Sequence, residues 1–275
     1  MSQAPNRYIP EHWGPTLASL CNGTAVTLRT IAHSKPSESE EDQKSIHDFF
    51  DTNLHSVPDL TEQINQGLAD HSSNLLRGLG TLIDQPVVTQ AVTAPLVVAC
   101  LETNSLLKFI NQFKSIHRCY WATRTITLNI NSPKRILNLR GFNDLLEVVQ
   151  TTYEKKLSTH RAPFLDDAIL VSEMMKGRVS NSFYEEQYDY THQHALSGFY
   201  DANWRKQHPE TAEFGSILGI VYALRSADSA ARLLANFRDS PDAAEALELL
   251  DAIADIRENM AHEVNELLEK YNAVN

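Results

Sequence analysis

The strongest constraint on the fold is a mostly apolar stripe that recurs every three or four residues near the C-terminus. Its members are Leu250, Ile253, Arg257, Met260, Val264, Leu267 and Tyr271. This spacing puts them on one side of an α-helix. Ser240-Pro241-Asp242 precedes the stripe and supplies a helix start, with serine as N-cap and proline at the first helical position. The pattern predicts a helix over residues 242–272 that buries one face.

The same spacing recurs along most of the chain. It predicts helices over 17–32, over a segment carrying Ile46, Phe49 and Phe50, and over 60–83, 95–129, 133–157, 182–206 and 212–237, with a further start at Pro163. Residues 123–130 have strand propensity, but no neighbouring segment offers a pairing strand, so we assign them to the end of a helix. The sequence therefore predicts an all-α bundle of seven to nine helices.

Charge divides the chain unevenly. Residues 160–275 hold 20 acidic and 10 basic side chains, whereas residues 1–159 are nearly balanced. The change predicts an N-terminal helical region (1–159) and an acidic C-terminal region (160–275), either as two units or as one continuous domain. The acidic excess disfavours nucleic acid as a partner.

Cysteine and hydropathy patterns bear on location. The three cysteines form no CxxC pair, so neither a disulfide framework nor a zinc ribbon is indicated. No secretory signal is visible, and no apolar run approaches the roughly 18 residues of a membrane span. We expect a cytoplasmic protein without a transmembrane segment.

The middle of the chain is basic and aromatic. From residue 103 to 143 there are seven lysines or arginines and no acidic residue. On a helix, the spacing predicts a binding surface formed by Lys108, Phe113, Lys114, His117, Arg118, Tyr120, Trp121 and Arg124. Its partner would be an anionic or hydrophobic surface or a partner protein. The alternative is intramolecular, with these helices facing the acidic C-terminal helices.

Residues 100–176 resemble phasins, the proteins that coat polyhydroxyalkanoate granules. The resemblance rests on the aromatic-basic run HRCYWATR and on SPKRILNLRGFNDLLEVVQTTYEKKL, with a Ser-Pro helix start, a Leu-x-Leu step and a long amphipathic continuation. Phasins usually have glutamine where this chain has Arg140. The resemblance implies a helical protein that lays an apolar face on a polyester or lipid-like surface.

DIRENMAHE, at 255–263, resembles the R-x4-H motif of HEPN ribonucleases. This resemblance implies metal-independent RNA cleavage at the cleft of a dimer, and so a homo-oligomer, with Arg257 on the phosphate and His262 in acid–base work. Glu258 and Glu266 lie one turn either side of His262 and make an acidic setting for RNA. The alternative is that Arg257 pairs with a buried carboxylate while His262 faces solvent.

A third candidate site lies in residues 184–208, which are rich in reactive side chains. Asp189, His192, His194 and Asp201 fall at helical spacings that could serve a metal- or haem-dependent bundle enzyme, although the chain has no Glu-x-x-His pair. GxGxxG, Walker and GxSxG motifs are absent, which argues against dinucleotide, P-loop and α/β-hydrolase sites. The sequence identifies no cofactor and leaves enzyme and binding protein both open.

Overall fold

The computed structural model describes residues 12–37, 40–50, 56–83, 90–113, 115–129, 142–157 and 209–274. In these ranges the chain forms eight helices: α1 (Trp13–His33), α2 (Glu40–Phe50), α3 (Ser56–Ile83), α4 (Gln90–Asn111), α5 (Ser115–Asn129), α7 (Phe142–Leu157), α11 (Pro209–Ala235) and α12 (Pro241–Val274). The described part holds no strand, only an isolated β-bridge between Pro36 and Arg238. The predicted all-α bundle is confirmed.

The start of α12 follows the sequence signal. The Asp242 amide donates to Ser240 Oγ at 3.2 Å, and the next two amides donate to the Ser240 carbonyl. Serine therefore satisfies amide groups that the first turn of a helix leaves without partners.

The prediction of one continuous helix over 95–129 is wrong, because the chain breaks after Asn111 and resumes at Ser115. Ser115 has a φ of 46°, in the left-handed region that interrupts a helix. Its hydroxyl donates to Asp42 Oδ1 of α2 at 3.0 Å. The break turns α5 away from the axis of α4, so the basic-aromatic residues do not lie along a single helix.

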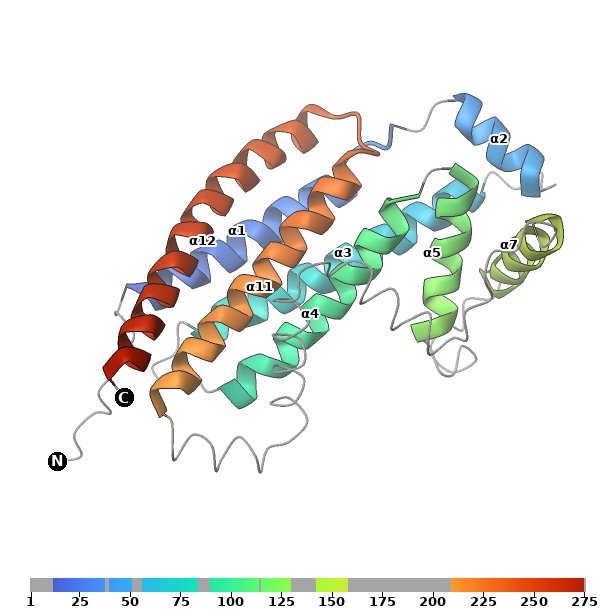
Figure 1. Cartoon of the computed structure of the whole chain (residues 1–275). Helices are drawn as coiled ribbons and strands as arrows, with labels where there is room; N and C mark the ends of the chain where they lie inside the picture. Colours follow the sequence, from blue (N-terminus) through green and yellow to red (C-terminus); the bar gives the residue numbers. More distant parts are fainter. Residues whose placement is uncertain are drawn as a thin grey trace.

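The main bundle is formed by α1, α3, α4, α11 and α12 (Figure 1). Trp13, at the start of α1, donates from Nε1 to Glu263 late in α12, while Pro36 after α1 pairs with Arg238 before α12. These contacts make α1 and α12 antiparallel. The neighbours α4 and α11 instead run in the same direction, as Figure 1 shows. The end of α4 and the start of α11 therefore lie at opposite ends of the bundle.

One hydrophobic core joins α1, α3, α4, α11 and α12. Helices α1 and α3 approach closely at Gly80, where a Cβ atom would lie 3.1 Å from the Ala18 carbonyl oxygen and 3.2 Å from Cys21 Cβ. The regions 1–159 and 160–275 both contribute to this core, so the change in charge near residue 160 does not separate two cores.

A second, smaller core lies beside the first and is built from α2, the first turns of α3, α5 and α7, with one residue from the end of α4. Its buried apolar residues are Ile46, Phe50, Val57, Leu60, Ile64, Ile110, Cys119, Tyr120, Ala122, Val149 and Tyr153. Helix α3 contributes to both cores and connects them.

The expectations about the cysteines and about membrane spans both concern buried parts of the protein. The three cysteines are free and buried. Burial raises the pKa of the Cys21 thiol to about 12, and burial together with Cys21 raises that of Cys100. Among the described helices, Thr93–Asn111 is long and apolar enough to cross a membrane, yet 78% of that stretch is buried within the protein.

Candidate functional site

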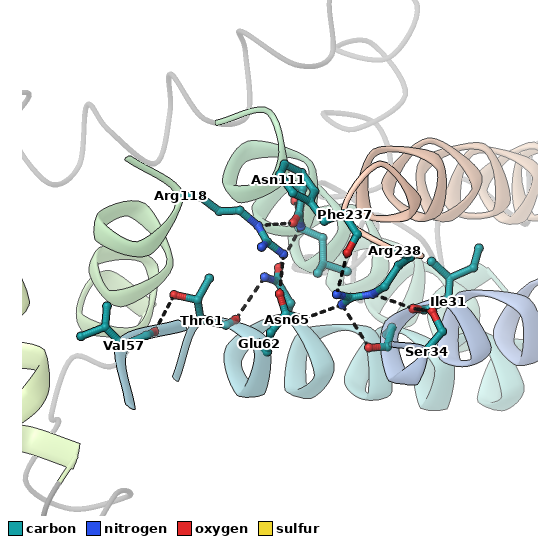
Figure 2. Close-up of polar contacts among 12 residues, drawn as sticks. Ile31, Ser34, Val57, Thr61, Glu62, Asn65, Asn111, Arg118, Phe237 and Arg238 are labelled. Carbon is teal, nitrogen blue, oxygen red and sulfur yellow. Dashed lines mark hydrogen bonds and ion pairs between the residues drawn. The ribbon is translucent and has the colours of Figure 1, made fainter. Parts of the chain in front are cut away.

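A buried ionic network connects helices from both ends of the chain. It consists of Glu62 on α3, Arg118 on α5 and Arg238 in the turn before α12, and we call it the glutamate–arginine network (Figure 2). Arg118 Nη2 donates to Glu62 Oε1 at 2.8 Å. Arg238 Nη2 lies 2.6 Å from Glu62 Oε2, as an ion pair whose angle falls outside hydrogen-bond geometry. Both guanidinium groups are buried.

Arg238 also closes the end of α1. Its guanidinium donates to three backbone carbonyl oxygens, those of Ile31 at 2.9 Å, Ala32 at 3.1 Å and Phe237 at 3.2 Å. Two of these carbonyls belong to the last turn of α1, where the helix leaves them without amide partners and where positive charge is favourable. Arg238 therefore fastens the turn between α11 and α12 to the end of α1.

Arg118 is held from three directions. Its Nε donates to Asn111 Oδ1 at 3.0 Å, and its guanidinium carbon lies 4.1 Å from the centre of the Phe237 ring. Asn111 in turn donates to Asn65 Oδ1 at 2.8 Å. The side chain is 1% exposed. Arg118 therefore links α5 to the main bundle and is not available to an external partner in this structure.

The other residues of the expected basic-aromatic surface are distributed differently. Lys108 and Tyr120 are buried, Phe113 and Trp121 are half-buried, and His117 is exposed; the side chains of Lys114 and Arg124 lie outside the described ones. The described residues of this set do not form one exposed basic face, because Lys108 and Arg118 are buried. The alternative, in which these basic residues pair within the protein, agrees better with the position of Arg118. Its acidic partner, however, is on α3 rather than on a C-terminal helix.

Two aromatic groups surround this region. Tyr120 stacks on Tyr153 of α7 with ring centres 3.8 Å apart, and His117 Nδ1 lies 2.6 Å from the Tyr153 hydroxyl. Burial raises the pKa of Tyr153. Separately, Trp121 packs against Phe109 and Phe113 with ring centres 4.9 and 5.9 Å away. Phe109 and Phe113 lie outside the two main cores, whereas Trp121 also packs against the smaller core, with its ring centre 5.0 Å from that of Tyr120.

The structure does not bring the two residues of the R-x4-H motif together. Arg257 is buried and donates from Nη1 to Asp228 Oδ2 at 3.1 Å. The His262 side chain is 76% exposed, with Nε2 3.1 Å from Glu266. Five positions on a helix correspond to about 140° of rotation, so the two side chains leave α12 on different sides. This arrangement matches the alternative to the ribonuclease prediction, in which Arg257 pairs with a buried carboxylate and His262 faces solvent.

Alternating charges bind α11 to α12. Arg232 donates to Asp228 at 2.6 Å and to Asp251 at 2.7 Å, and Arg225 forms a two-pronged pair with Glu258. The hydrogen bond from Arg225 is the main reason that the pKa of Glu258 is lowered. The acidic residues on this side of α12 are therefore neutralised within the protein.

Another side of α12 carries exposed apolar side chains. Four large apolar residues are exposed in the described part of the chain, and three of them are Val26 (47%) on α1 and Leu249 and Ile256 (49% each) on α12. A Cβ on Gly23 would lie 2.8 Å from Ile253 Cδ1, so Gly23 of α1 and Ile253 of α12 lie at the same height along the two antiparallel helices. Moving one turn along each helix brings Val26 level with Leu249. We call Val26, Leu249 and Ile256 the α1–α12 ridge.

Sequence reasoning missed both the network and the ridge. The network joins residues far apart in the chain; the basic-aromatic pattern includes Arg118, but no local pattern marks Glu62 or Arg238. The ridge does have a signal, because Leu249 and Ile256 repeat at seven residues beside the buried stripe of α12.

The expected metal ligands Asp189, His192, His194 and Asp201 lie outside the described residues. Within the described ranges, no group of three His, Cys, Asp or Glu side chains is arranged to hold a metal ion. Comparison with protein-family models, curated proteins and solved structures finds no match to this chain.

Proposed function

We propose that this chain is a helical interaction protein that binds a partner protein on the α1–α12 ridge. The observation that carries the proposal is that three of the four exposed large apolar residues of the described part lie on the packed neighbours α1 and α12. Contiguous apolar side chains at a surface are typical of interaction sites. The fourth exposed large apolar residue, Val148, is on α7, which belongs to the smaller core and not to the α1–α12 ridge.

The binding free energy expected from covering the ridge is that of a modest hot spot. Full burial of a leucine or isoleucine contributes about 1.5–3 kcal/mol, so covering the exposed half of each ridge residue contributes about 1 kcal/mol. Three such residues account for about 3 kcal/mol, which polar contacts at the rim would supplement.

Site-specific photo-crosslinking tests this proposal. Ala252 is exposed and lies between Leu249 and Ile256 along α12. A photoreactive residue at 252 should yield discrete adducts with another protein in cells, and Leu249→Glu with Ile256→Glu should abolish them. The matched control is Val148→Glu, which changes an exposed apolar residue elsewhere and should leave the adducts intact. Adducts that survive the double change, or their absence from the unchanged ridge, would overturn the proposal.

A surface-coating function like that of phasins is the second candidate. It is supported by the Phe109, Phe113 and Trp121 group at the edge of the smaller core, in which the Phe113 and Trp121 rings are half-buried. Such rings are suited to contact an oily surface. Flotation with polyester granules or anionic lipid vesicles should then recover the protein, and Phe113→Ala with Trp121→Ala should reduce recovery. A protein that stays in solution in both experiments would exclude this function.

A further inference from the structure

We infer that the occupant of the α1–α12 ridge is a basic amphipathic helix of the partner protein; this rests on the proposed function. The first argument is geometric. Leu249 and Ile256 are seven residues apart, which is close to two helical turns and about 10.5 Å. A partner helix presents apolar residues at the same interval. Ala252, exposed between them, has a small side chain that permits close approach.

The second argument is charge. Glu245, Glu248 and Asp255 are exposed, and none forms an ion pair with another described residue. By position they flank the ridge: Glu245 lies one turn before Leu249, and the other two each directly precede a ridge residue. Lysines or arginines beside the apolar residues of the incoming helix would complement these carboxylates.

The same charges argue against other occupants. The acids of α12 on the α11 side are already paired with Arg225 and Arg232, so the unpaired acids are concentrated toward the solvent side. A second copy of this chain would place two sets of these unpaired acids opposite one another. Anionic lipid and nucleic acid would be repelled for the same reason.

The partner can be replaced by a defined probe. A fluorescent peptide of roughly 21 residues, long enough to form a helix, would carry leucine on one face and lysine beside it. Its anisotropy is measured with the full-length protein, next to a scrambled peptide of equal composition and a peptide with glutamate in place of lysine. The lysine helix should bind about tenfold or more tightly than either control, and more weakly as salt increases.

Variants locate the binding. Leu249→Ser with Ile256→Ser should weaken the lysine helix about tenfold or more. Glu245→Gln, Glu248→Gln and Asp255→Asn together should weaken it and flatten its salt dependence. Val148→Ser should have no effect, and circular dichroism verifies that each variant is folded.

Three results would overturn the inference. The glutamate peptide could bind as tightly as the lysine peptide, or Val148→Ser could weaken binding as much as the Leu249→Ser, Ile256→Ser variant does. Sedimentation could also show a dimer of this chain that the Leu249→Ser, Ile256→Ser variant dissociates. The two proposals fail separately. If neither charged peptide binds while the adducts at residue 252 persist, the occupant is wrong and the interaction site stands. If the adducts are also absent, both proposals fail.

Discussion

Replacing Glu62 by alanine should be among the most destabilising single changes in the described part of the chain. The change removes the carboxylate between Arg118 and Arg238, whose side chains are 1% and 0% exposed. Arg238 keeps its three backbone carbonyls, and Arg118 keeps Asn111 and Phe237. Each arginine therefore loses one charged contact, worth about 1.5–3 kcal/mol. The expected loss of unfolding free energy is about 3–5 kcal/mol, as for other buried pairs broken from one side.

Urea unfolding followed by circular dichroism measures this loss. With a slope of about 3 kcal/mol/M, the midpoint should fall by about 1–1.7 M. Glu62→Gln keeps the size of the side chain and an acceptor oxygen, so it should cost less than alanine. Glu245→Ala is the control, because Glu245 is an exposed glutamate on α12 and should shift the midpoint little.

A double-mutant cycle with Arg118→Ala separates the pair from the general cost of truncation. Glu62 and Arg118 should show a coupling energy of about 1.5–3 kcal/mol. If Glu62→Ala costs no more than Glu245→Ala, or if the coupling is near zero, the network does not stabilise the packing of α3 against α5 and the turn before α12.

Three further outcomes are expected. Gly80→Val should lower the melting temperature, because its side chain would meet Ala18 and Cys21, at a cost of about 1–3 kcal/mol. The three buried thiols should resist Ellman's reagent at pH 8 until urea unfolds the protein, and rapid modification of the native protein would contradict their burial. Glu258, whose folded pKa is lowered by Arg225, stabilises the fold above the ordinary value of 4.5 and loses that contribution as pH falls through its lowered pKa. The difference in melting temperature between the native protein and Glu258→Gln should therefore narrow in acid; a constant difference would refute this.

Helical periodicity accounts for most of what the sequence could predict. The stripe of α12 and its serine cap identified that helix to within a few residues. The break between α4 and α5 could not be found this way, because neither glycine nor proline occurs from Asn111 to Ser115. Tertiary contacts mark this corner: Asn111 bonds to α3 and receives Arg118 from the next helix, while Ser115 bonds to α2.

In the candidate site, too, local spacing predicted some features and tertiary packing decided the others. The position of Arg257 within the buried stripe suggested a carboxylate partner, but the identity of Asp228 depended on how α11 packs on α12. For Glu62 and Arg238, the charge count of each region gave no sign that they would meet inside the protein. Local spacing predicts which side of a helix is covered, whereas the neighbour that covers it is decided by packing.

The packing of α4 against α11, a helix far from it in the sequence, has a consequence for synthesis of this protein on the ribosome. Helices α1, α3 and α4 leave the exit tunnel early, but α11, which packs against α4, begins only at Pro209. Roughly 100 more residues must be translated after Asn111 before synthesis of α11 even begins, which takes about 5–20 s at ordinary rates. During that interval the apolar side chains of α1 and α4 lack their final cover. The nascent chain is therefore a natural client for chaperones that shield apolar surface, and a stop codon placed before α11 should yield an insoluble product.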